Sequence, residues 1–245
     1  MHQCLIAHYY KSILNFFFLV LRYLITTGWS SSSSLKTEII DLSDPTKSCL
    51  IEDDISTITS YSLLRSTGGL LGTTPVICGG YETSGNTLNE CLLYGTSQVL
   101  TMNSNRGGHS SVALNNSMLW ILGGYSNGLS DSTEFITIDG AVNGPTLPEA
   151  VEASCAVKFP ETGFVYLIGG RTPSDFPSNN VWVANPSNEF AFNQGPSLIT
   201  ARGHHTCGTM SIGAKSIIVA AGGNPGFLTS VEILDPLSNQ WVAGK

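Results

Sequence analysis

Four short apolar segments, each followed by two adjacent glycines, constrain the fold of this chain more than any other feature. The first glycines of successive pairs lie 44, 46 and 53 residues apart. Self-similarity at this period marks an array of small units that bury their apolar faces against one another. A short β-branched run predicts a buried strand, and paired glycines allow positive φ or the close approach of another backbone. The pairs are Gly79-Gly80, Gly123-Gly124, Gly169-Gly170 and Gly222-Gly223.

The remainder of each repeat predicts further strands. A polar loop and a second strand follow each glycine pair, and we expect these strands at residues 89–94, 132–139, 180–185 and 230–235. Turn dipeptides end them, a short outer strand follows, and an arginine opens the strand that leads to the next pair. We assign the recurring charged residues to backbone hydrogen bonding near the glycines: Glu90, Glu134, Glu232, Arg106 and Arg202. Four short antiparallel strands per repeat predict one blade of a β-propeller.

This order of features resembles the kelch repeat: four apolar residues, a double glycine, a later glutamate, a tryptophan and an arginine. The resemblance covers residues 75–245 and implies an all-β, kelch-type β-propeller with four-stranded blades. Four blades are visible, fewer than the about six that usually close a kelch ring, so we expect an incomplete ring. The outer-strand tryptophan of the motif is present in the last repeat, as Trp241, and missing from the first three. The third repeat departs further, with Trp182 in place of the glutamate and residues 149–155 in place of the arginine. Residues 49–91 also resemble the start of a secreted, disulfide-containing branch of kelch-type proteins.

The first 30 residues differ from the rest of the chain. Lys11 precedes an apolar stretch and small polar residues follow it, so residues 1–30 predict a secretory signal peptide or hydrophobic leader. The alternative is a membrane anchor through residues 13–25, although Arg22 interrupts the about 20 apolar residues that a span needs. We assign residues 31–74 to a linker with one or more approach strands. The expected location is extracellular.

Five of the six cysteines follow the predicted leader. Cys78 ends the first apolar strand and Cys91 lies on the next, so an antiparallel hairpin would bring their sulfurs within disulfide range. Cys155 and Cys207 occupy equivalent positions in two successive repeats, where they either pair or remain as buried thiols. Cys49 has no assigned partner. Secretion would also make Asn115, in the sequence Asn-Asn-Ser, a glycosylation site.

Charge and motif content argue against several functions. The formal net charge is −7 and no run of Lys or Arg occurs, which argues against nucleic-acid binding. His109 and His205 each lie three residues after a repeat arginine, with His204 adjacent, and could hold a metal at a central channel. No carboxylate or thiol stands at a recognised ligand spacing, so we favour structural histidines and expect neither a metal nor another cofactor.

The loops after the glycine pairs are the remaining candidates for function, because loops on a rigid scaffold commonly carry binding sites. They contain residue types enriched in binding hot spots: Tyr81, Tyr125, Arg171, Phe176 and Phe227. We therefore expect a non-catalytic module that binds a protein or glycan outside the cell. The alternatives are an intracellular kelch adaptor that presents a substrate protein, and a propeller oxidase or hydrolase.

Overall fold

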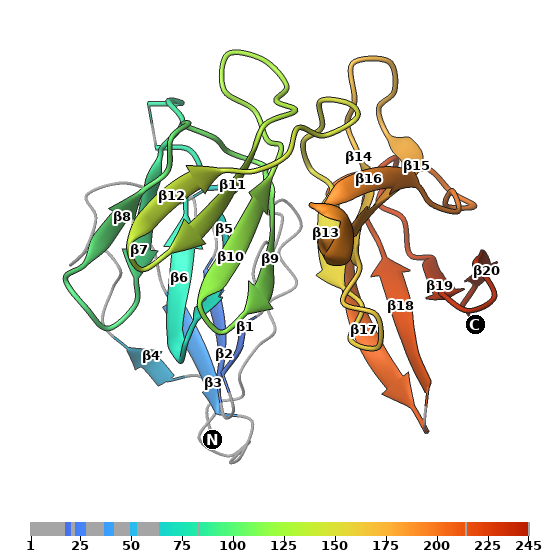
Figure 1. The fold of residues 1–245 in the computed structure, drawn as a ribbon, viewed down its shortest axis with the longest axis horizontal. Helices are drawn as coiled ribbons and strands as arrows, with labels where there is room; N and C mark the ends of the chain where they lie inside the picture. Colours follow the sequence, from blue (N-terminus) through green and yellow to red (C-terminus); the bar gives the residue numbers. More distant parts are fainter. Residues whose placement is uncertain are drawn as a thin grey trace.

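The computed structural model describes residues 64–82, 84–213 and 215–244, together with the backbone of four short strands between residues 18 and 52. This part of the chain is all-β, as the sequence predicted (Figure 1). Its strands form five four-stranded antiparallel sheets, and in each sheet the strands lie side by side in sequence order. The one helix among the described residues is a short 3-10 turn, η3 (Pro186–Asn188).

Four of the sheets correspond to the four predicted repeats. Their first strands are β5 (Thr67–Leu71), β9 (Ser110–Asn115), β13 (Cys155–Lys158) and β17 (Thr206–Ile212). Their second strands, which precede the glycine pairs, are β6 (Thr74–Cys78), β10 (Met118–Leu122), β14 (Val165–Gly170) and β18 (Lys215–Ala221). Their third strands are β7 (Glu90–Leu93), β11 (Thr133–Thr137), β15 (Ser178–Asn185) and β19 (Val231–Asp235). Their fourth strands are β8 (Val99–Thr101), β12 (Gly140–Asn143), β16 (Ala191–Gln194) and β20 (Gln240–Ala243).

The fifth sheet lies at the N-terminal end of the chain, where the sequence showed no repeat. It consists of β1 (Phe18–Val20), β2 (Tyr23–Thr27), β3 (Thr37–Asp41) and β4 (Leu50–Glu52). Two of these strands fall in the predicted leader, and two fall in the predicted linker. The linker prediction also included β5, so the first repeat sheet begins at Thr67 rather than near residue 75. Cys49 lies outside the described residues.

The second strands of the first three repeat sheets are mostly apolar because both of their faces are buried. In β6, Val76 and Cys78 face the following sheet and pack with Leu119 and Ile121 of β10. The alternate residues of β10 face the other way, toward β14 and its neighbours. Consecutive side chains of a strand point to opposite faces of the sheet, so β10 and β14 each contribute to two interfaces. The short apolar runs in the sequence are therefore explained by sheet-on-sheet packing.

The last sheet differs from the others because one of its faces has no sheet packed on it among the described residues. Ile218 and Ala220 of β18 are buried against the preceding sheet. On the opposite face, Met210, Ile212 and Val242 are more than half exposed.

The first strands of consecutive repeat sheets contact one another, β5 with β9, β9 with β13 and β13 with β17. Where these strands begin, backbone hydrogen bonds of 2.7–2.8 Å join the sheets in series: Gly108 N donates to Arg65 O, Ala153 N to Gly108 O, and His204 N to Ala153 O. All four residues have φ between +54° and +64°. One backbone conformation therefore recurs at the same level of four neighbouring sheets.

We call this end of the sheets the loop end, because the connections from second to third strands also leave here (upper end in Figure 1). At the opposite end, the hairpin end, each first strand turns directly into the second strand.

Candidate binding site at the loop end

The glycine pairs let the backbone of the next sheet approach closely. All eight glycines have positive φ. A Cβ on Gly79, Gly123 or Gly169 would stand only 2.3–2.4 Å from a carbonyl oxygen of the following sheet. The second glycine of each of these pairs donates its N–H to that same carbonyl at 2.7–2.8 Å. Both roles expected of the glycines, positive φ and close approach, are thus present at the first three pairs.

Two of the repeat arginines and glutamates form buried clamps inside the sheets. Arg106 donates to Gly123 O at 2.6 Å, to Ser132 O at 3.1 Å, and to Glu134 Oε1 at 2.6 Å. Glu134 also accepts the backbone N–H groups of Asn103 and Ser104, in the segment that connects β8 to β9. The side chains of Arg106 and Glu134 are each 1% exposed. The charges of Arg106 and Glu134 are therefore paired inside the sheet packing and are not exposed to a ligand.

The last sheet repeats this clamp. Arg202 donates to Gly222 O at 2.8 Å and to Glu232 Oε1 at 2.7 Å, and Glu232 accepts from the N–H groups of Ile199 and Thr200. We call each such set an Arg–Glu clamp.

Glu90 does not occupy the position of Glu134 and Glu232, although sequence counting grouped the three. In the pairing with the second strand, the position of Glu134 is held by Leu92 in the first repeat sheet. Glu90 lies two residues earlier, where its carbonyl accepts the N–H of Gly79 at 2.8 Å. The grouping failed because the loop of the first repeat is longer, so a fixed count from the glycines does not reach the same position.

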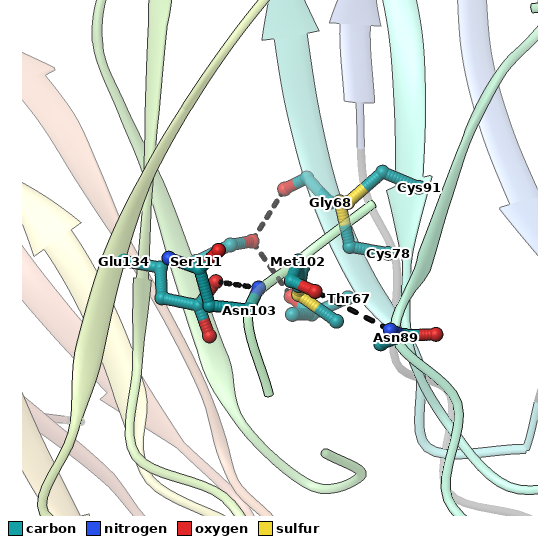
Figure 2. The surroundings of a disulfide bond; sticks show 9 residues. All are labelled: Thr67, Gly68, Cys78, Asn89, Cys91, Met102, Asn103, Ser111 and Glu134. Atoms are coloured by element: carbon teal, nitrogen blue, oxygen red, sulfur yellow. Dashed lines mark hydrogen bonds between the residues drawn. A yellow bond between two sulfur atoms is a disulfide. The ribbon is translucent and has the colours of Figure 1, made fainter. Parts of the chain in front are cut away.

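Both cysteine pairs form disulfides, which differ in what they connect. Cys78 and Cys91 are directly paired residues of β6 and β7, with Cα atoms 4.0 Å apart, so this bond lies within one sheet (Figure 2). Cys155 and Cys207 are 5.8 Å apart between Cα atoms and join β13 to β17, so this bond links two sheets. Two disulfides favour an oxidising compartment.

The equivalence of Cys155 and Cys207 assumed from the sequence is wrong by one residue. Cys155 pairs with Ile168 and the corresponding residue of the last sheet is Thr206, so Cys207 is one position further along. The disulfide is therefore a diagonal contact. Thr67 and Ser111 occupy the same diagonal positions between β5 and β9, where their hydroxyls are hydrogen-bonded at 2.7 Å (Figure 2).

The histidines lie within or beside the packing between sheets. The imidazole of His109 lies against Gly79 of the preceding sheet, and that of His205 lies against Gly169. Burial, together with the charge of Arg202, lowers the pKa of His205 to about 3, and burial beside Arg106 lowers the pKa of His109 well below its ordinary value. Within the described residues, no three His, Cys, Asp or Glu side chains are grouped so as to hold a metal ion.

Three of the five predicted binding-loop residues come together at the loop end. Tyr81, Tyr125 and Arg171 each directly follow a glycine pair and are half-buried. The guanidinium of Arg171 lies over the ring of Tyr125, 5.7 Å from its centroid, and forms an ion pair with Glu152 at 3.1 Å. The ring of Tyr81 fills the space that a side chain at Gly107 would need.

Phe176 and Phe227, the other two predicted residues, are placed differently. Phe176 packs on Gly203 and meets His204 edge-on, with ring centroids 6.1 Å apart, so it borders this group. Burial and the nearby guanidiniums of Arg65 and Arg171 lower the pKa of His204 to about 4. Phe227 is 73% exposed in the loop between β18 and β19, and no described ring contact joins it to the others.

Arg65 and Glu152 belong to this group, although the sequence analysis did not select them. Glu152 occupies the position of Gly107 and Gly203, each of which bridges to the residue after its glycine pair. Its side chain is 4% exposed, and its Oε2 atom has no hydrogen-bond partner among the described residues. A glutamate replacing a repeat glycine was a visible sequence difference that could have identified it. We call Arg65, Tyr81, Tyr125, Glu152, Arg171 and His204 the loop-end cluster.

Asn115, the predicted glycosylation site, is exposed at the hairpin end. It ends β9, and its side-chain Oδ1 accepts from the N–H and the hydroxyl of Ser117. A glycan there would lie at the other end of the sheet from the loop-end cluster.

No helix among the described residues has the length and hydrophobicity needed to cross a membrane. No protein-family model matches the sequence, and no curated protein matches it significantly.

Proposed function

We propose that this chain is a non-catalytic binding module, secreted or displayed at the cell surface, built on a kelch-type β-propeller arc. The four-stranded meanders, the recurring glycine pairs and the serial contacts between first strands support this architecture. In this reading each repeat sheet is one blade, and the loop-end cluster binds a protein or glycan partner.

The observation that carries the proposal is the convergence of Tyr81, Tyr125 and Arg171 at one end of the sheets. They come from three different loops, yet the scaffold places them around one group of charged side chains. Aromatic and arginine side chains held rigidly at a surface lose little conformational entropy when they bind a partner. The two disulfides support an extracellular setting.

Cell-surface binding by protein recovered from culture medium would test this function. The chain is expressed with its own N-terminal segment, labelled, and applied to a panel of cells and extracellular matrix preparations. We expect saturable binding that the triple variant Tyr81→Ser, Tyr125→Ser, Arg171→Ser abolishes. The matched control, Ile138→Ser, Val142→Ser, Leu237→Ser, removes exposed apolar side chains from turns and edges away from the loop end and should bind normally. Equal binding by both variants, or retention of the chain inside the cell, would refute the proposal.

A further inference from the structure

We propose that the loop-end cluster binds an acidic oligosaccharide, with Arg65 and Arg171 holding the carboxylate of one sugar and the groove beside Tyr81 and Tyr125 holding its neighbour. This inference rests on the proposed function and specifies the class of ligand.

The first step is the distribution of positive charge. Residues 64–244 contain six basic side chains, and four of them are engaged away from the cluster. Arg106 and Arg202 are buried in the Arg–Glu clamps, Lys158 donates to a backbone carbonyl, and Lys215 lies near Asp235. The remaining two, Arg65 and Arg171, are both close to His204. Within residues 64–244, the two guanidiniums that are not engaged elsewhere thus lie close together.

The second step is the space beside Arg65. A cavity of about 180 Å³ lies between the first strands, and Arg65, Gly108, Ala153 and His204 line it at the loop end. Arg65 makes no side-chain hydrogen bond or ion pair with the described residues. The Arg65 guanidinium lines this cavity, and its planar pair of N–H donors matches the two-oxygen geometry of a carboxylate.

The third step concerns Glu152, which competes with such a ligand. One of its oxygens pairs with Arg171, and the other, Oε2, lies next to Gly108 without a hydrogen-bond partner among the described residues. This buried carboxylate shows that the site already accommodates an anionic group beside Arg171. A ligand carboxylate therefore finds its second cation in Arg65, and the affinity is limited by repulsion from Glu152.

The fourth step is the adjoining groove. A groove of about 460 Å³ runs between the first two loops and is lined by Tyr81 and Tyr125. The guanidinium of Arg171 lies over the ring of Tyr125. The rest of its lining is almost entirely polar: it includes the amides of Asn86, Asn105 and Asn127 and one carboxylate, Glu82, which accepts from the Asn86 amide. Amides both donate and accept hydrogen bonds, as sugar hydroxyls do, and tyrosine rings offer flat apolar surfaces to the C–H faces of a sugar ring. This combination favours a sugar over an apolar peptide side chain.

The test is calorimetric titration of the purified full chain with a short oligogalacturonide, and with the same oligomer after complete methyl esterification. We expect binding of the acid, loss of binding for the ester, and weaker binding as salt is raised. Replacing Arg65→Gln should weaken binding about tenfold or more, because a charge-assisted hydrogen-bonded pair is lost. The matched control Lys215→Gln removes the same charge at the hairpin end and should leave the affinity unchanged.

A second variant gives the opposite sign. Glu152→Gln removes the competing charge and releases Arg171, so it should raise the affinity for the acid severalfold, whereas a purely structural glutamate would give equal or weaker binding. Equal affinity for acid and ester, a failure of Glu152→Gln to raise it, or equally tight binding of polyaspartate or of a sulfated galactan would overturn the inference. If cell-surface binding still depends on the loop end in that case, the proposed function stands and only the ligand class is wrong.

Discussion

In the sheets β9–β12 and β13–β16, the third strand is hydrogen-bonded to the segment that enters the sheet, but donor and acceptor are reversed between the two sheets. In the first, Glu134 on the third strand accepts two backbone N–H groups from the segment that enters the sheet. In the second, Trp182 holds the position of Glu134, and its indole N–H donates to Glu149 at 2.8 Å. Glu149 lies in the entering segment, at the position that Ser104 has in the other sheet. The acceptor and donor have exchanged sides of one junction.

In these two sheets the junction is closed by a hydrogen bond of either direction, so no particular charge is needed there. The clamp needs a buried arginine to compensate its buried glutamate. The third sheet has Val151 at the position of Arg106, where its carbonyl makes the same bond to the preceding glycine pair. This sheet therefore has no buried arginine in the clamp position. The adjacent glutamate, Glu152, forms its ion pair with Arg171 at the loop end. The repeat that departs most from the motif therefore supplies two charged members of the loop-end cluster.

Breaking an Arg–Glu clamp should have the largest effect on stability. Arg106→Met leaves Glu134 buried without its cation, and we expect the free energy of unfolding to fall by about 3–5 kcal/mol. The double variant Arg106→Met, Glu134→Leu should recover a large part of this loss, because no uncompensated charge remains. Urea unfolding followed by tryptophan fluorescence measures both. If the double variant were as unstable as the single one, the loss would come from packing and not from the orphaned charge.

Removing the disulfide between sheets should have the next largest effect. Cys155→Ala with Cys207→Ala opens a loop with a sequence separation of 52 residues, which corresponds to about 4 kcal/mol in the chain-entropy model. The same change at Cys78 and Cys91 opens a separation of 13 residues, corresponding to about 3 kcal/mol. Cys155→Thr with Cys207→Ser would recreate the hydroxyl pair of Thr67 and Ser111. Unfolding in denaturant ranks the variants, and a larger loss at Cys78 and Cys91 would contradict the expected order.

Acid sensitivity should distinguish the clamp sheets from the third sheet. His109 and His205 lie in clamp sheets, and the third sheet has Ser154 at their position. A histidine whose pKa is lowered on folding binds fewer protons in the folded state, so its stabilising effect is complete above pH 6.5 and is lost as the pH falls toward the folded pKa. Each buried histidine should contribute a slope of up to about 1.4 kcal/mol per pH unit below pH 6.5.

The variant His109→Ser, His205→Ser copies the third sheet and should flatten the dependence of unfolding free energy on pH between about 5 and 6.5. Carboxylates titrate mainly below this window, so the slope that remains in the variant should come mainly from His204, whose pKa is also lowered. An unchanged slope would mean that the imidazoles gain protons without unfolding.

Most of the fold could be predicted from the glycine pairs. All eight glycines have positive φ, and at Gly79, Gly123 and Gly169 a carbonyl oxygen of the next sheet occupies the place that a Cβ would need, so other residues are excluded. Strand order and the bond between Cys78 and Cys91 followed from hairpin geometry. The N-terminal sheet has no glycine pair, so the sequence predicted only approach strands in residues 31–74 and no complete sheet. Glu90 and Cys207 were misplaced because counting along the chain ignores loop length and register. Arg65 and Glu152 were missed because the cluster forms across sheets, through contacts that no repeat position records.

The smallest predicted effect lies at the inverted junction of the third sheet. Glu149 accepts from Trp182 and Asn180, both at 2.8 Å, and is half-buried. Glu149→Leu should lower the free energy of unfolding by about 1–3 kcal/mol, since two donors lose their acceptor. Glu149→Gln keeps an acceptor oxygen and should cost less than Glu149→Leu, in contrast to the clamp, where the charge itself is paired. Urea unfolding of both variants tests whether this junction depends on hydrogen bonding alone. A Gln variant as unstable as the Leu variant would show that the third sheet also relies on a buried charge, and the distinction between the two kinds of sheet would then be one of sequence only.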